Sequence, residues 1–569
     1  MVGQAAPVSD PALAPAADNH VSWVPMITIA LGQMLMSFNV ASLPVALGGM
    51  VQSFNVPPTT VATAIVMYSM AVAGLVMLGA KLNQRYGAPR VFRAVVVVFG
   101  LAQVLMTFSP TATLMITAQG ISGMAGAALV PSLVALIANE YRGRQQATAL
   151  GALGSARAAA GVAAFLIGGI LGTYIGWRPV FGILIVLSAL VVVLSFRLNP
   201  ERERPDVGID GVGVVLAAVA VLLLSFGFNN LNRWGLGLAL PGAPFTVLGL
   251  SPAPLMIVLG LAFGQIFLSW THRRQAAGRT PLLALQVIDS PEERAAVYAM
   301  FSVVALEAAL NFSVPLYIQI VQGRTPLATA VAMLPFNLSV FFAALLITRL
   351  YDRFTPRQIG RAGFVLCSVA LLWLAFVVFN DWSELPVLVG LVLFGIGQGS
   401  LVTLVFNVLV TASPKDLAGD VGSLRGTTNN LAAAVGTAVA GALLVGLLST
   451  SVLRSLAEHP TLPPALQSQV DLDSITFVSN DRLRSVMAGT TATPEQVDEA
   501  IRVNAEARLR ALKIGFLLMA ALSLLTIIPA GRLPPYRPGE IPGSRPERAA
   551  GESTTADAQS PAGAIANPA

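Results

Sequence analysis

The sequence predicts an all-α membrane protein built of about fourteen membrane-spanning helices. Two observations carry this prediction. Of the 569 residues, 55% are hydrophobic and only 11% are charged, which is more apolar surface than a water-soluble chain can bury. The apolar residues also form segments of about 18 residues or more, long enough to cross a bilayer as helices, and clusters of turn-forming or charged residues separate them.

The expected spans form two groups of six helices with one pair between them. The spans of the first group lie near residues 24–50, 57–80, 91–110, 112–139, 146–172 and 179–198. The spans of the central pair lie near residues 211–229 and 254–271. The spans of the second group lie near residues 295–320, 326–348, 359–380, 386–411, 421–449 and 512–530.

These groups define the predicted domain organisation. Both ends of the chain are rich in small residues and proline, a composition typical of disorder. In order, we expect a disordered cytoplasmic leader at 1–23, an N-terminal six-helix bundle at 24–198, two extra helices with their linkers at 199–293, a C-terminal six-helix bundle at 294–530, and a disordered cytoplasmic tail at 531–569. The C-terminal bundle carries an extracytoplasmic insert at 450–511.

The insert at 450–511 contains a clear helix start. Thr493, Pro494 and Gln496 combine an N-cap residue, a proline at the first helical position and a capping-box partner. Apolar residues then recur at helical spacing toward the last span. We expect a small helical cap over the outer mouth of the protein, and the alternative is a module that binds a protein partner.

The basic residues indicate how the chain is oriented. Lys and Arg gather in alternate short loops, as Arg85 and Arg90 do after the second span and Arg349 and Arg353 do after the tenth. Such loops face the cytoplasm. We therefore expect a multi-pass protein of the plasma membrane, or of the inner membrane of a bacterium, with both termini in the cytoplasm. This loop bias also accounts for the net charge of +6 without nucleic-acid binding.

Two segments of the first half have counterparts in the second half at nearly the same offset. The sequence around Ser42 and Pro44 is similar to that around Ser313 and Pro315, and the loop that contains Arg85 is similar to the one that contains Arg353. An internal repeat of this kind indicates two parallel halves. The substrate site of such a protein is expected at the interface between its halves.

Further motifs mark the spans and the loops between them. They are Tyr68 with Ala71, the loop 80–90, Gln119 with Gly120, Gly168-Gly169 followed by 177–181, the segment 316–326, Pro335, the segment 419–422, and Gly436. With these motifs the chain resembles the major facilitator superfamily, and specifically its fourteen-helix drug:proton antiporter branch. The resemblance covers residues 24–530. It implies a major facilitator fold, with two six-helix bundles and a central extra helix pair.

The chain departs from the antiporter pattern at four places. Gln84 stands where the family has an aspartate, Ile116 replaces an arginine associated with proton coupling, and Ala164-Phe165 replaces a Gly-Pro pair. The first span offers Asn39 where the family often has an acid. These departures weaken the expectation of standard proton antiport.

The resemblance also assigns roles to loops and glycines. It implies cytoplasmic gating loops, which latch the two halves by charge pairing with helix ends and which here contain Arg85, Gly87, Arg90, Asp352 and Arg353. Because Gln84 replaces the usual acid, we expect this latch to have lost one charged contact. A helix-packing motif of the fifth span contains Gly161, Gly168 and Gly169.

Two charged residues stand inside apolar spans. Arg157 lies near the middle of the fifth span and Glu307 near the middle of the ninth, where an ionised group needs a partner or an aqueous cavity. Burial disfavours the charged form of a carboxyl, so Glu307 is a candidate for proton coupling. The alternatives are a non-titrating structural carboxyl and a group that binds a substrate cation. Arg157 could bind an anion, pair with Glu307, or extend to the cytoplasmic face.

Polar residues of other spans are candidates for the cavity wall. With Arg157, the substrate candidates are Asn39, Tyr68, Gln119, Asn311, Gln319, Asn337 and Arg425. The amides could instead form hydrogen bonds between helices, and Arg425 could lie at the membrane interface.

No enzyme motif, cofactor site or metal site is expected. Cys367 is the only cysteine, and the glycines at 395, 397 and 399 lie within an apolar span, unlike those of a phosphate-binding loop. We expect a monomeric secondary active transporter that exports drug-like or amphipathic small molecules by alternating access. Its partners would be this substrate, the lipid bilayer and protons coupled through Glu307. The alternatives are a transporter of an anionic metabolite or lipid without standard proton antiport, and a membrane scaffold or sensor.

Overall fold

The structure is a computed structural model of the whole chain. It describes residues 22–56, 58–201, 203–318, 326–379, 384–412, 417–458, 484 and 493–535. Gln319, most of the insert at 450–511 and nearly all of the expected leader and tail lie outside these residues, so their expected roles remain predictions.

The first half consists of six long helices that match the expected spans. They are α1 (Val24–Phe54), α2 (Pro58–Tyr86), α3 (Ala88–Thr107), α4 (Ala112–Glu140), α5 (Gly143–Tyr174) and α6 (Arg178–Ser195). The central pair is α7 (Gly211–Trp234) and α8 (Pro252–Ala276). The short helix η1 (Leu285–Ile288) lies in the linker that leads to the second half.

The second half also contains six long helices. They are α9 (Pro291–Leu316), α10 (Pro326–Leu346), α11 (Pro356–Val377), α12 (Glu384–Ala412), α13 (Ala418–Glu458) and α16 (Pro494–Leu525), with the short helices η3 (Ile347–Asp352) and α17 (Ile527–Ala530) after α10 and α16. The described part of the chain therefore contains fourteen long helices, as the sequence predicts.

The composition of these helices confirms a membrane protein. Among the described residues, thirteen helices are long and apolar enough to cross a membrane. The fourteenth long helix, α13, carries Asp420 and Arg425 in its first two turns. These two charged side chains therefore need polar or charged partners inside the protein.

Local sequence sets where several helices begin. Ser290, Thr355 and Thr493 each form a capping box, in which the hydroxyl accepts a hydrogen bond from a backbone N–H one turn ahead and the side chain of Glu293, Gln358 or Gln496 accepts one in return. A proline follows each cap, where its missing N–H costs nothing. The predicted helix start at Thr493 is thus confirmed.

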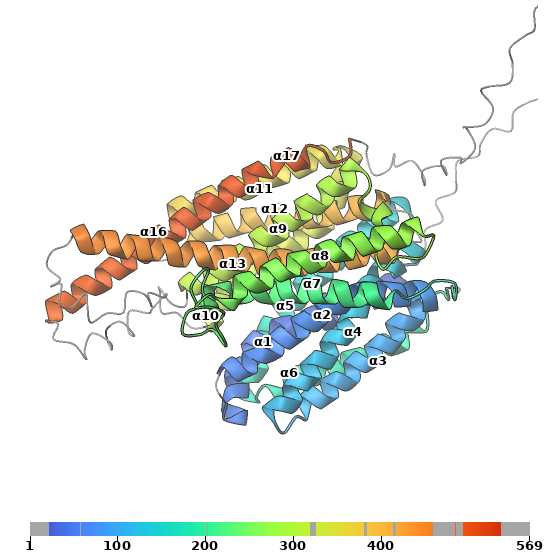
Figure 1. The fold of residues 1–569 in the computed structure, drawn as a ribbon, viewed down its shortest axis with the longest axis horizontal. Helices are drawn as coiled ribbons and strands as arrows, with labels where there is room; N and C mark the ends of the chain where they lie inside the picture. The colour runs from blue at the N-terminus through green and yellow to red at the C-terminus, as the bar shows by residue number, and fades with distance from the viewer. Residues whose placement is uncertain are drawn as a thin grey trace, which may run out of the picture.

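The long helices run side by side and form two bundles (Figure 1). In the first half α2 packs on α4, α1 on α5 and α3 on α6, and in the second half α9 packs on α13 and α10 on α12. Close approach of α2 and α4 depends on glycine. A Cβ atom added at Gly79 would lie 2.5 Å from the Cα of Ala128, and one at Gly123 would lie 2.5 Å from the carbonyl oxygen of Tyr68.

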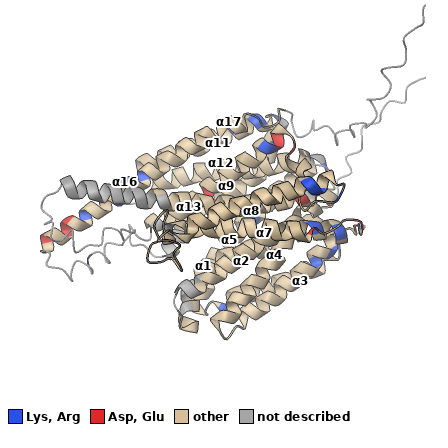
Figure 2. Ribbon diagram, viewed as in Figure 1, with Lys and Arg blue, Asp and Glu red and all other residues tan. Residues whose placement is uncertain are grey.

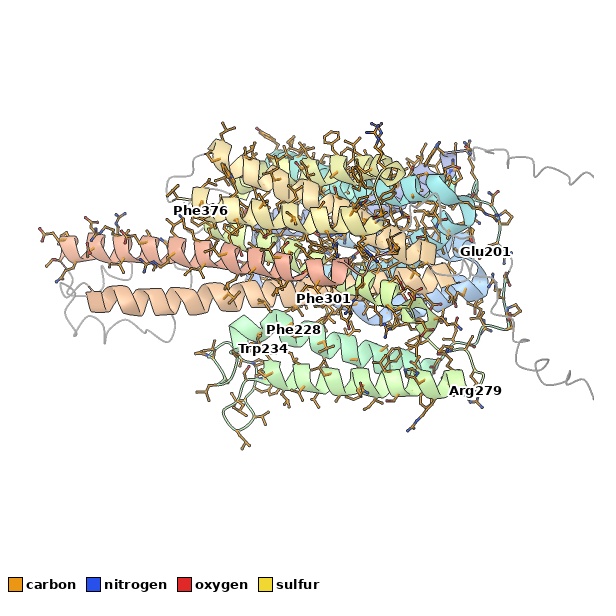
Figure 3. All side chains as sticks on the ribbon, turned by 90° about the horizontal axis from the view of Figure 1, so that it is seen from above. Glu201, Phe228, Trp234, Arg279, Phe301 and Phe376 are labelled. Atoms are coloured by element: carbon orange, nitrogen blue, oxygen red, sulfur yellow. The ribbon has the colours of Figure 1, made fainter. Side chains whose placement is uncertain are left out.

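The central pair forms a hairpin beside the two halves (Figure 3). It packs on α2 and α13. Its polar clamp is Asp210, whose buried carboxylate caps α7 by accepting from the N–H of Gly213 and also accepts from the indole N–H of Trp270. Arg274 lies 3.4 Å from the same carboxylate. These contacts hold α7 and α8 together as one unit.

Most Lys and Arg residues lie at one end of the bundle, which we call the basic end (Figure 2). It is the end where α2, α8 and η3 finish with Arg85, Arg274 and Arg349. At the opposite end α13 and α16 extend beyond the other helices as a pair, which we call the projecting arm (Figures 1 and 3). α13 and α16 pack on each other.

Candidate functional site

The two halves meet closely where α5 crosses α10 and α12 near the basic end. A Cβ atom added at Gly151 of α5 would lie only 2.7 Å from the carbonyl oxygen of Ala344 on α10. The hydroxyl of Ser155 donates a 3.0 Å hydrogen bond to the carbonyl oxygen of Phe341. Small side chains therefore let the backbones of the two halves touch on the basic side of the membrane.

The next charged residue along α5 joins the halves in a different way. Arg157 Nη2 lies 3.6 Å from Glu307 Oε1 on α9, and the amide of Gln398 on α12 donates a 2.8 Å hydrogen bond to Glu307 Oε2. Gln398 is buried, whereas the side chains of Arg157 and Glu307 are 40% and 18% exposed. We call these three residues the central triad. Of the roles considered for Arg157, the structure shows pairing with Glu307.

Beyond the central triad, this side of α5 has a gap at one position. Gly154, Arg157 and Gly161 follow one another at helical spacing, so they line one side of α5. A Cβ atom at Gly154 would contact Thr403 of the second half, but one at Gly161 would have nothing within 4 Å. A Cβ atom at Gly161 would therefore meet open space, so no close helix contact is formed at this position. Gly168, by contrast, lies close to Val45 and Val180.

A second arginine lies buried near the central triad. Arg425 of α13 is 7% exposed, and its guanidinium carbon lies 4.0 Å from the centre of the Phe406 ring. Within the described residues, no carboxylate comes within 4.0 Å of Arg425. Phe406 follows Gln398 of the central triad by eight residues on α12, about 12 Å along the helix, so Arg425 lies on the basic side of that triad. The structure thus buries Arg425 rather than placing it at the membrane interface.

Asn39 and Gln119 form a reciprocal pair between α1 and α4. The amide of each donates to the carbonyl oxygen of the other, at 3.0 Å and 3.2 Å, and both side chains are fully buried. Each amide thereby satisfies its partner without a ligand, which favours the helix–helix role over substrate contact.

The other substrate candidates are placed individually and do not converge. Tyr68 is buried against Gly126 of α4, and Asn337 donates to the carbonyl oxygen of Met333 within its own helix. Asn311 is exposed, and Gln319 lies outside the described residues. Gly169, which belongs to the expected helix-packing motif, also takes part in an interaction with another residue.

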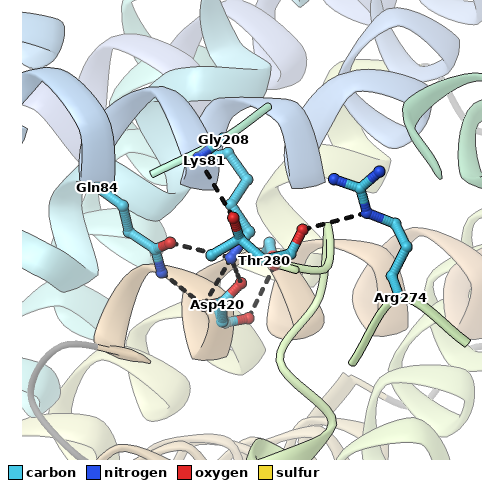
Figure 4. A network of polar contacts seen from close by, with 7 residues as sticks. Lys81, Gln84, Gly208, Arg274, Thr280 and Asp420 are labelled. Carbon is cyan, nitrogen blue, oxygen red and sulfur yellow. Dashed lines mark hydrogen bonds and ion pairs between the residues drawn. The ribbon is translucent and has the colours of Figure 1, made fainter. Parts of the chain in front are cut away.

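The basic end holds a second polar contact between the halves, which Figure 4 shows in detail. Lys81 Nζ of α2 lies 3.2 Å from Asp420 Oδ1 of α13, and the Gln84 amide donates a 2.5 Å hydrogen bond to Asp420 Oδ2. Lys81 also donates to the Gln84 carbonyl oxygen at 2.9 Å. We call Lys81, Gln84 and Asp420 the basic-end triad.

The predicted gating loops lie around this triad. Gly87 has a φ of 82°, a left-handed conformation that favours glycine at the α2–α3 turn. Arg90 forms an exposed ion pair with Glu203, and the carbonyl oxygen of Arg85 accepts from the N–H of Arg204. Arg353 is exposed, and the side chain of Asp352 lies outside the described part. The charge contact across the halves is therefore made by Lys81, which the sequence reasoning did not single out.

Comparisons with known proteins agree with this architecture. The family model described as Major Facilitator Superfamily matches residues 29–437. The chain is 26% identical over 435 residues to "Multidrug efflux pump LfrA" of Mycolicibacterium smegmatis, covering 76% of this chain and 82% of the relative. It is 24% identical to "Tetracenomycin C resistance and export protein" of Streptomyces glaucescens, covering 78% and 83%.

Solved structures give the same fold at lower identity. The human organic anion transporter MFSD10 matches with a TM-score of 0.52 and 12% identity, covering 89% of this chain and 98% of that one. The proton:xylose symporter XylE matches with a TM-score of 0.51 and 11% identity, covering 89% and 94%.

Among the described residues, no group of three or more His, Cys, Asp or Glu residues could hold a metal ion.

Proposed function

The chain belongs to the major facilitator superfamily and is a membrane transporter rather than an enzyme, and from this premise we propose that it exports drug-like, amphipathic small molecules by alternating access. Two relatives named for export support the direction of transport. One is a multidrug efflux pump, and the other is an export protein for tetracenomycin C. In this proposal the substrate binds between the two halves, at the level of the central triad.

The observation that carries the proposal is the change in contact between the halves along α5. At Gly151 the backbones of the two halves lie close together and at Ser155 a hydrogen bond joins the halves, while a Cβ atom at Gly161 would meet nothing within 4 Å. The ion pair between Arg157 and Glu307 lies at this transition. Such a geometry supports a carrier that is closed at the basic end and open beyond the central triad. Transport requires the opposite arrangement as well, so the contacts at the basic end must break during the cycle.

We further propose that Glu307 couples this cycle to protons. Two side chains from other helices contact its carboxylate. The guanidinium of Arg157 forms an ion pair with it, and the amide of Gln398 donates a hydrogen bond to it. A protonated carboxyl loses its Coulomb attraction to a guanidinium, so protonation would release α5 from α9. Its 18% exposure leaves a path for a proton to reach it.

Orientation follows from the same arrangement. We propose that the basic end faces the cytoplasm, because short loops rich in Lys and Arg stay on that side. Both termini would then be cytoplasmic. Labelling of single cysteines placed in the loops after α2 and α6, in a Cys367→Ser background, tests this. Labelling from outside intact cells would overturn it.

The experiment for export uses purified protein in liposomes with a fluorescent amphipathic substrate. A pH gradient should drive transport by the wild type, and Glu307→Gln should lose the dependence on the gradient while still binding substrate. Glu292→Gln is the matched control, because it removes a carboxylate from the first turn of the same helix, at the basic end. Gradient-driven transport that is undiminished in Glu307→Gln would remove Glu307 from the coupling mechanism.

A further inference from the structure

The charges around the central triad do not balance. Arg157 and Arg425 bring two positive charges and Glu307 brings one negative charge, which leaves one positive charge in excess. Arg157 has Glu307 as its partner, so the excess charge belongs to Arg425. In the described part of the chain, the π face of Phe406 is the contact recorded for the Arg425 guanidinium. A ring face attracts a cation but does not neutralise it.

Burial makes this imbalance costly. Arg425 is more than nine-tenths buried, and its helix packs on α2, α4 and α9, so it cannot reach water as an exposed arginine would. A buried charge is normally paired with an opposite charge or bound to a ligand. In the described part of the chain, the Arg425 guanidinium is therefore a buried cation with no carboxylate beside it.

The position of Arg425 places the excess charge beside the proposed substrate path. Arg425 lies seven residues into α13 and Arg157 lies fourteen residues into α5, which at 1.5 Å per residue is about 10 Å and about 20 Å from the basic ends of these helices. The two arginines therefore differ in level by about 10 Å, with Arg425 nearer the basic end. Beyond Arg157, α5 has the gap at Gly161, and Phe165 one turn further on is only half-buried.

We propose that the transported molecule is an amphipathic anion, whose single negative group binds between Arg425 and Arg157 and whose apolar part lies along α5 toward Phe165. One negative charge brings the site to neutrality without removing Glu307 from Arg157. A cation would instead have to enter a region that already carries excess positive charge. This inference rests on the proposed transport function and adds to it the charge of the substrate.

The test compares two probes that share one fluorophore and differ in a permanent charge, pyrenesulfonate and pyrenylmethyl-trimethylammonium. Binding is measured to the full-length protein in lipid nanodiscs, with empty nanodiscs subtracted. The wild type should prefer the anion. Arg425→Ala and Arg157→Ala should each weaken anion binding about tenfold or more, which is the loss expected for one charge-assisted contact.

Two further variants keep the result interpretable. Arg93→Ala is the matched control, because Arg93 of α3 also stacks on a phenylalanine, Phe196, at 3.9 Å but lies outside the interface between the halves. It should bind the anion like the wild type. Arg425→Lys keeps the charge and should retain more anion binding than Arg425→Ala. It decides the question if the alanine variant does not fold.

The outcomes separate this inference from the proposed function. Preference for the cation, or anion binding in folded Arg425→Ala equal to that of the wild type, would overturn the anion site. If the alanine variant does not fold, complete loss of anion binding in folded Arg425→Lys, which keeps the charge, would overturn it. Efflux of the cationic probe alone from liposomes would leave export standing and reject the anion. Anion binding that depends on Arg425, in a protein that moves neither probe across the membrane, would support the site and count against export.

Discussion

The basic-end triad and the central triad contain the same kinds of chemical group but differ in how deeply these groups are buried. Each joins the two halves through one cation, one carboxylate and one glutamine amide. At the basic end, the Lys81 and Asp420 side chains are 3% and 0% exposed and lie 3.2 Å apart. In the centre, the Arg157 and Glu307 side chains are 40% and 18% exposed and lie 3.6 Å apart. The difference in burial implies different roles.

A buried pair is costly to break, because each charge left behind lacks water as well as its partner. A partly exposed pair can exchange its partner for water, a proton or a ligand at lower cost. We therefore interpret the basic-end triad as the contact that holds the halves closed, and the central triad as the contact that responds to substrate and protons. The predictions below test this comparison, beginning with the largest expected effect.

Removing the carboxylate of the basic-end triad should have the largest effect. Asp420→Ala leaves the Lys81 ammonium buried without its carboxylate, and breaking a buried pair in this way costs about 3–5 kcal/mol. The closed arrangement at the basic end should become less stable. Cysteines placed on α2 and α13 near the triad should then react faster with a soluble thiol reagent.

The double variant Lys81→Met/Asp420→Leu sharpens this prediction. It removes both charges, so the uncompensated ammonium is gone, and the reaction rate should return toward that of the wild type. Equal reactivity of Asp420→Ala and the wild type would show that the basic-end triad does not hold the halves together.

Two glycine substitutions on α5 should change the stability of the protein in different directions. Gly151→Ala places a Cβ 2.7 Å from the backbone oxygen of Ala344, so the halves must shift apart, at a cost of about 1–3 kcal/mol. Gly161→Ala meets open space and should be neutral or stabilise the helix by up to about 1 kcal/mol. Thermal unfolding in detergent compares the two. A fall in Tm for Gly161→Ala equal to that for Gly151→Ala would contradict the opening of the halves beyond Arg157.

The smallest effect on stability is expected at the central triad. Glu307→Gln keeps an acceptor for Gln398 but loses the ion pair, and a partly exposed pair contributes only up to about 1 kcal/mol. Its Tm should therefore lie close to that of the wild type and well above that of Asp420→Ala. A loss of stability in Glu307→Gln as large as that in Asp420→Ala would remove the distinction between the two triads.

The sequence was sufficient to predict the fold, because the length and apolar composition of each segment identify a membrane helix. Helix starts such as Thr493 also depend on a few adjacent residues and could be predicted locally. Arg157 and Glu307 were each visible as charges inside apolar spans. Their contact was not, because it depends on how α5 and α9 are rotated and packed, which periodicity alone does not determine.

The basic-end triad shows a different limit. Lys81 and Asp420 lie near helix ends, where charges are ordinary, and 339 positions separate them in the chain. Gln84 in place of an acid led to the expectation of a weakened latch. In the structure the carboxylate stands on α13 instead, opposite Lys81, so a charged contact is present with its signs exchanged between the two sides. Only the packing of α2 against α13 could reveal this.

The length of α13 has a mechanical consequence. This helix starts beside Lys81 at the basic end and continues into the projecting arm, and its 41 residues span about 60 Å. Within the bundle it packs on α2, α4 and α9, while its far end extends with α16 beyond the other helices. A tilt of about 5° around Asp420 would displace the far end by about 5 Å, given a rigid helix of this length. The tip of the arm thus magnifies a small movement at the basic end into one large enough to measure.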